Sequence, residues 1–150
     1  MNDQGEIIWI RGNRVIKNQI MAITESKVTE EKNSLAICLD TILKFKGVPR
    51  NTEEYLNAGK NAIEILAENL PNVKVVDLTG CPLDAMLYFT NQDIPVLATL
   101  NNGEAILITG FNQYQVVIME PKTGRLYKKG MNDTAEWLEE NGNRFIAYFE

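Results

Sequence analysis

The 150-residue sequence contains no histidine. Histidine is the usual general base of hydrolytic enzymes near neutral pH, because its unperturbed pKa of about 6.5 lies close to that pH. A serine or cysteine nucleophile needs such a base, or a strongly lowered pKa of its own, before it can attack a carbonyl. The composition therefore excludes every hydrolytic mechanism that depends on a histidine base.

Positive charge is also scarce. Fifteen lysines and arginines face twenty aspartates and glutamates, which gives a formal net charge of -5 and a pI of about 4.9. Proteins that bind nucleic acid use basic stripes to displace counterions, and proteins that dock on anionic membranes use basic clusters. The charge balance therefore argues against a nucleic-acid partner and against docking on an anionic membrane.

Long hydrophobic runs are missing. No apolar stretch approaches the roughly 18 residues of a membrane-spanning helix. The first residues, MNDQGEIIWIRGN, carry acidic groups before a short apolar stretch, whereas a signal peptide begins with basic residues and a longer apolar block. We expect no insertion of this chain into a membrane.

The two cysteines, Cys38 and Cys81, form neither a CxxC pair nor a metal-binding spacing. Cys38 lies within an apolar helical run, where it is expected to be a small buried hydrophobic residue. A disulfide between the two remains open, because sequence does not show whether their Cα atoms approach each other. Phosphate-binding and dinucleotide-binding glycine motifs are absent too. We expect no cofactor and no metal.

What the chain does contain is the composition of one globular domain, with 45% hydrophobic and 23% charged residues. Hydrophobic periodicity and turn residues place the elements. Strands are expected at 6–10, 14–23, 73–78, 95–100, 104–109, 115–119, 125–129 and 144–149. Helices are expected at 34–47, 52–69, 82–91 and 134–141. Helices dominate early and strands late, which predicts an α+β fold with a mostly antiparallel sheet.

Local signals are expected to fix the helix ends. Ser34 suits an N-cap and Gly47 a C-terminal stop for a helix that is apolar nearly all round, as buried helices are. The spacings Asn51/Glu54 and Asp133/Glu136 are typical of capping boxes at the start of two later helices.

This order resembles a papain-like cysteine peptidase, specifically the bacteriocin-processing family that cleaves after a double glycine. The segment NSLAICLDTILKFKGV is similar to that family's buried central helix. The segments IPVLATL, GEAILITGFNQYQVVIMEPKTG and TAEWLEENGNRFIAYF are similar to its later strands and closing helix. The resemblance covers residues 33–149. It implies a papain-like fold, with a buried central helix packed on a mostly antiparallel sheet.

We therefore expect one peptidase-like domain over 1–150, with N-terminal strands and a loop in 1–32 and a family-like core in 33–149. A domain belonging to a longer protein is compatible with this expectation. The resemblance implies a bacterial protein, acting either as a soluble domain in the cytoplasm or as part of a cell-envelope protein.

Carried over position by position, the resemblance implies a degenerate member that lacks the catalytic cysteine and histidine. The cysteine position falls on Ser34, the histidine position on Glu104 and the acid position on Glu120. Cys38 is a poor replacement nucleophile, because it lies one turn further into the helix. The family's oxyanion glutamine has no counterpart between Lys27 and Asn33. The resulting expectation is a catalytically inactive domain that binds a peptide or a partner protein.

Two alternatives remain. Pairing Thr109 with Gln115 would place Glu104 opposite Glu120, and two close carboxyls can perform acid–base hydrolysis, as in retaining glycosidases. The same glutamates could instead face solvent or pair with a lysine or arginine, and Ser34 could be only a helix cap. The chain could also be a structural or oligomerising domain of a larger cell-envelope protein.

Overall fold

A computed structural model of the chain describes residues 6–10, 13–17 and 33–150. Within the first two ranges, β1 (Glu6–Ile10) and β2 (Asn13–Lys17) pair antiparallel. The strand expected over 14–23 is thus seen as far as Lys17, and its remainder lies outside the described residues.

Residues 33–150 form five helices and six strands. The helices are α1 (Ser34–Phe45), α2 (Thr52–Asn57), α3 (Ala62–Asn69), α4 (Leu83–Thr90) and α5 (Met131–Glu140). The strands are β3 (Lys74–Asp77), β4 (Val96–Thr99), β5 (Ala105–Phe111), β6 (Gln115–Glu120), β7 (Arg125–Gly130) and β8 (Arg144–Phe149). They form one sheet in the order β3-β8-β4-β5-β6-β7, and every neighbouring pair is antiparallel. The expected α+β class and antiparallel sheet are confirmed.

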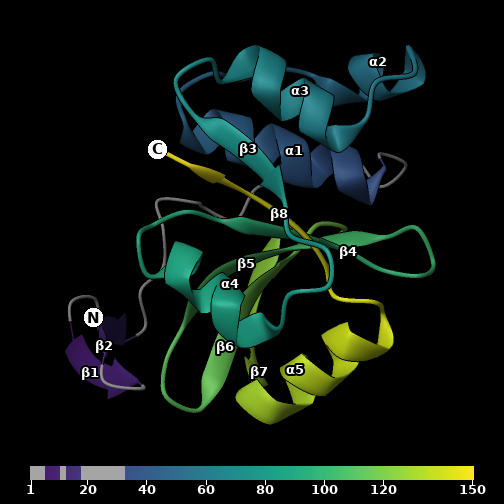
Figure 1. Cartoon of the computed structure of the whole chain (residues 1–150). Coiled ribbons are helices and arrows are strands. Elements are labelled where there is room, and N and C mark those ends of the chain that lie inside the picture. Colours follow the sequence, from purple (N-terminus) through teal and green to yellow (C-terminus); the bar gives the residue numbers. More distant parts are fainter. Residues whose placement is uncertain (1–5, 11–12, 18–32) are drawn as a thin grey trace.

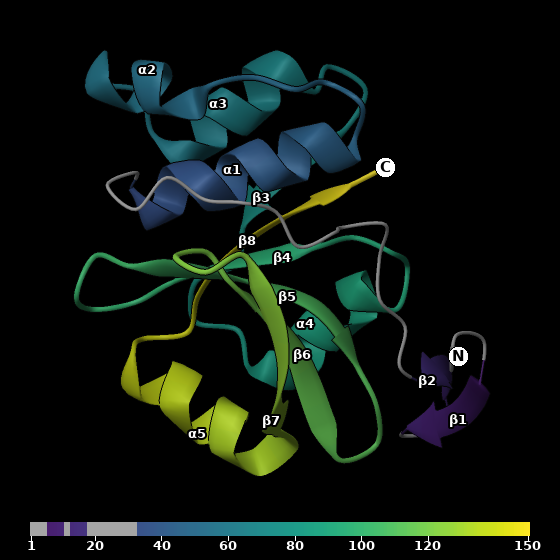
Figure 2. The ribbon, with the colours of Figure 1, turned by 180° about the vertical axis from the view of Figure 1, so that it is seen from behind.

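The sheet separates two groups of helices (Figure 1). Helices α1, α2 and α3 lie on one side, with α1 between the sheet and the other two, whereas α4 and α5 lie on the other side. The view from behind shows the same layers (Figure 2). Ala36, Cys38, Leu39 and Leu43 of α1 have no exposed surface. Each fully buried aliphatic side chain contributes about 1.5–3 kcal/mol, so α1 is the buried central helix that the sequence predicts.

The prediction of one continuous helix over 52–69 was wrong, because two shorter helices occupy this range. α2 ends at Asn57 and α3 begins at Ala62, with Gly59 between them at φ +97. This left-handed conformation suits glycine and ends a helix. The capping box lies at Asn61 and Glu64, where each side chain accepts a hydrogen bond from the other residue's backbone N–H.

The other helix starts also differ from expectation. Asn51 occupies the N-cap of α2 but makes no capping hydrogen bond with its side chain. Instead, Asp40 of α1 accepts hydrogen bonds from the Thr52 backbone N–H at 2.8 Å and from the Thr52 hydroxyl at 2.6 Å. α5 begins at Met131 after Gly130, so Asp133 lies inside the helix and no capping box with Glu136 forms there.

Candidate functional site

Ser34, which the resemblance assigns to the cysteine position, is the first residue of α1 and is only 3% exposed. Its Oγ accepts a hydrogen bond from the backbone N–H of Ala105, the first residue of β5, at 2.9 Å. The N-cap is Asn33, whose Oδ1 accepts from the Leu35 N–H at 2.7 Å. The interpretation of Ser34 as the helix cap was therefore wrong. Its hydroxyl instead ties the start of α1 to the central strand of the sheet.

Glu104, which the resemblance assigns to the histidine position, directly precedes β5 and is half-buried. Its backbone is fixed on both sides, because its N–H donates to Asn102 Oδ1 at 2.9 Å and its carbonyl accepts from the Leu100 N–H at 2.8 Å. Within residues 33–150, its carboxylate makes no hydrogen bond and no ion pair. Since Ala105 is bonded to Ser34, Glu104 lies beside the N-terminus of α1.

The strand register differs from the predicted one. Leu107 pairs with Met119, whereas Gly110 pairs with Val117, so the register shifts at Thr109. Continuing the Leu107–Met119 register by one pair places Glu120 opposite Ile106. Glu104 is then two residues further along the same face of the neighbouring strand, a diagonal rather than a directly opposed neighbour. The hairpin end is the reason, because β5 continues to Phe111, which pairs with Val116, whereas the prediction paired Thr109 with Gln115. The bulge at Thr109 shifts Glu120 by only one residue, toward Glu104.

Glu120, which the resemblance assigns to the acid position, is the last residue of β6 and pairs with Arg125 of β7 in the sheet register. Its carboxylate accepts a hydrogen bond from the backbone N–H of Lys122 in the following turn. Glu120 is thus engaged in stabilising the turn between β6 and β7.

Cys38 lies one turn into α1 and is fully buried. Burial raises the pKa of its thiol well above the usual value, and the charges of Glu120 and Glu104 raise it further. Since the thiolate rather than the thiol is the nucleophile, Cys38 is held in its unreactive form. Cys38 and Cys81 are both free, so the disulfide left open by the sequence is not formed.

Ser34 and Glu104 thus lie together at the start of α1, and Cys38 lies one turn into the same helix. The helix N-terminus supplies a partial positive charge there, but the sequence has no histidine that could act as a general base toward Ser34. Within the described part of the chain, no group of three or more cysteine, aspartate or glutamate side chains is placed to hold a metal ion.

The sequence did not reveal a second cluster at the other end of α1. Lys46 forms an ion pair with Glu150, and its ammonium lies 5.4 Å from the centroid of the Tyr148 ring. Lys46 and Glu150 are 104 positions apart, so no local pattern could indicate their contact.

The fold is similar to a crystal structure from Bacillus anthracis of a protein assigned as a C39-like peptidase. The TM-score is 0.72 at 15% sequence identity, and the match covers 89% of this chain and 98% of that chain. At this identity the similarity concerns the fold alone. No protein-family model and no curated protein matches the sequence. The chain therefore has a peptidase-like, papain-like fold. None of the helices in the described residues is long and apolar enough to span a bilayer.

Proposed function

We propose that the chain is a single peptidase-like domain without peptidase activity, which binds a peptide or a partner protein. The observation that carries this proposal is the burial and hydrogen bonding of the Ser34 hydroxyl. Its oxygen accepts the Ala105 N–H and is almost fully buried, while the sequence has no histidine to take its proton. A hydroxyl without a base is a poor nucleophile.

Cys38 supports the same proposal, because burial and two neighbouring carboxylates raise its pKa. A peptidase using this thiol would need the opposite shift. The binding site would lie at the N-terminal end of α1, beside Glu104 and Glu120. A helix N-terminus and half-buried carboxylates can hold polar groups of a ligand without any covalent step.

Two measurements test the loss of activity. Peptides that include double-glycine leaders are incubated with the protein and analysed by mass spectrometry, and the protein is treated with serine-hydrolase and cysteine-peptidase probes. We expect intact peptides and no label on Ser34 or Cys38. Cleavage that disappears in S34A or C38A would overturn the proposal.

Binding is tested separately by amide chemical-shift mapping with the same peptides. We expect shifts at Ser34, Glu104 and Ala105, and weaker binding by E104Q. The matched control is E139Q, on an exposed position of α5 across the sheet. Shifts elsewhere, or equal losses in E104Q and E139Q, would place the ligand away from this site.

An acid–base hydrolase that uses Glu104 and Glu120 is the second candidate, because the strand register places the two residues diagonally across neighbouring strands. Retaining glycosidases hold their carboxyls about 5–5.5 Å apart. This candidate predicts glycoside hydrolysis that is lost in both E104Q and E120Q. Turnover that survives in either variant, or is absent from the unmodified protein, would refute it.

A further inference from the structure

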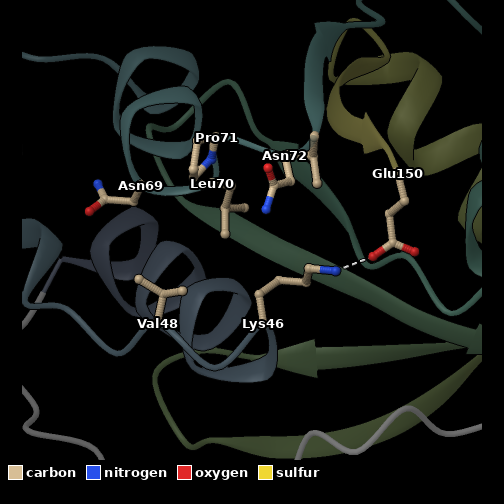
Figure 3. A pocket seen from close by; sticks show the side chains of 8 residues that line it. Lys46, Val48, Asn69, Leu70, Pro71, Asn72 and Glu150 are labelled. Carbon is tan, nitrogen blue, oxygen red and sulfur yellow. Dashed lines mark hydrogen bonds and ion pairs between the residues drawn. The ribbon is translucent and has the colours of Figure 1, made fainter.

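A cavity of about 360 Å³ lies at the C-terminal end of α1, opposite the end that carries Ser34 (Figure 3). Its walls come from the end of α1, the turn between α3 and β3, and the residue that follows β8. Ser34 and Lys46 are twelve residues apart on one helix, which is about 18 Å along its axis. The cavity is therefore separate from the candidate site described above, and its volume falls at the small end of ligand pockets.

The lining has one apolar part and one charged part. Val48, Leu70 and Pro71 supply the apolar surface. Lys46 and Glu150 form an ion pair at its border, where their side chains are 24% and 51% exposed. Figure 3 shows the Lys46 ammonium reaching across the cavity toward the Glu150 carboxylate. One positive and one negative group thus stand next to each other beside an apolar wall.

The Asn72 side chain adds a neutral polar group to this lining. Its amide is drawn close to Leu70 in Figure 3. Among residues 33–150, its donor and its acceptor make no hydrogen bond. An amide carries both two donor hydrogens and an acceptor oxygen, so Asn72 can bind either end of a polar ligand.

We propose that this cavity binds a free α-amino acid with an aliphatic side chain. The ligand carboxylate pairs with Lys46, its ammonium pairs with Glu150, and its side chain packs on Val48 and Leu70. A ligand with a single charge can pair with only one of Lys46 and Glu150, and it competes with the existing ion pair for that group. A zwitterion replaces that one pair by two, so both charges stay compensated.

The test is a titration of the full chain with L-leucine, followed by amide chemical shifts. Parallel titrations use isoamylamine and 4-methylpentanoate, which keep the side chain and only one of the two charges. We expect saturable shifts at Lys46, Leu70 and Asn72 at ligand concentrations up to about 1 mM, with much weaker binding of both analogues. Absence of these shifts, or equal binding of either analogue, would overturn the proposal.

Variants provide a second readout. K46M should weaken leucine binding about tenfold, the loss of one charge-assisted hydrogen bond. The control is K60M, which removes a lysine from another exposed ion pair, the one with Glu68 at 2.5 Å. Unchanged affinity in K46M would contradict the assigned role of Lys46. If K46M does not fold, the analogue titrations on the unmodified protein decide the question.

Discussion

The hydrogen bond from the Ala105 N–H to Ser34 Oγ gives a quantitative prediction. S34A removes the acceptor and leaves a buried backbone donor without a partner, because Ala105 is 1% exposed and the bond is 2.9 Å long. An unsatisfied buried donor costs about 1–3 kcal/mol. For a chain of this size, each kcal/mol lowers Tm by about 2–4 °C. We therefore expect S34A to lower the free energy of unfolding by about 2 kcal/mol and Tm by roughly 4–8 °C.

The assay is urea unfolding followed by far-UV circular dichroism, together with a thermal scan. The matched control is T79A, which removes the hydroxyl that Thr79 donates to Asp77 Oδ1 at 2.6 Å in an exposed turn. Surface changes of that kind stay within about 0.5 kcal/mol. A stability loss in S34A no larger than in T79A would refute the structural role assigned to Ser34.

The remaining predictions concern titration, reactivity and packing. The hydrogen bonds from Thr79 lower the pKa of Asp77. The contribution of Asp77 to stability is therefore present above its unfolded pKa and is lost as pH falls through its folded pKa, below about pH 4. T79A should raise the Asp77 pKa in a carboxyl NMR titration, and an unchanged pKa would show that the Thr79 hydroxyl does not lower it. A thiol reagent at pH 8 should modify half-buried Cys81 in the folded protein and Cys38 only after unfolding, because burial raises the Cys38 pKa; two fast thiols would contradict this. T52V should lower the free energy of unfolding by about 1–3 kcal/mol in urea, because it removes the one buried Thr52 hydroxyl proton, which faces the Asp40 carboxylate at 2.6 Å and the Ala36 carbonyl at 3.0 Å; an unchanged midpoint would show that this donor contributes nothing.

The sequence could predict the helices and strands whose side chains are buried at regular intervals or along their whole length. β5 is buried throughout and α1 is buried on most sides, and both carry long apolar patterns that leave little choice of element. The interruption at Gly59 was missed, because an isolated glycine is compatible with a helix or with its end. Only the left-handed φ of +97 decides between these.

The site was harder to predict because it depends on tertiary contacts. Asn33 and Ser34 are adjacent and both are good N-cap residues, so local sequence cannot choose between them. Ser34 is not the cap because its hydroxyl oxygen accepts a hydrogen bond from the N–H of Ala105, 71 positions away. The register of β5 and β6 was similarly out of reach, because the prediction closed the hairpin at Thr109 and Gln115, whereas the strands pair out to Phe111 and Val116 and Thr109 forms a bulge.

These contacts also distinguish the two candidate functions. Acid–base hydrolysis needs two carboxyls that can exchange protons with a substrate. In the structure Oε1 of Glu120 accepts the Lys122 N–H, and the strand register places Glu120 diagonal to Glu104 rather than directly opposite it. An acid–base role would therefore need both carboxyls to act on one substrate across this diagonal, with Glu120 using its other oxygen. Binding needs only Glu104, which can pair with a donor group of a ligand while Ser34 and Glu120 keep their present partners. The hydrolytic proposal therefore makes a geometric demand that the binding proposal does not.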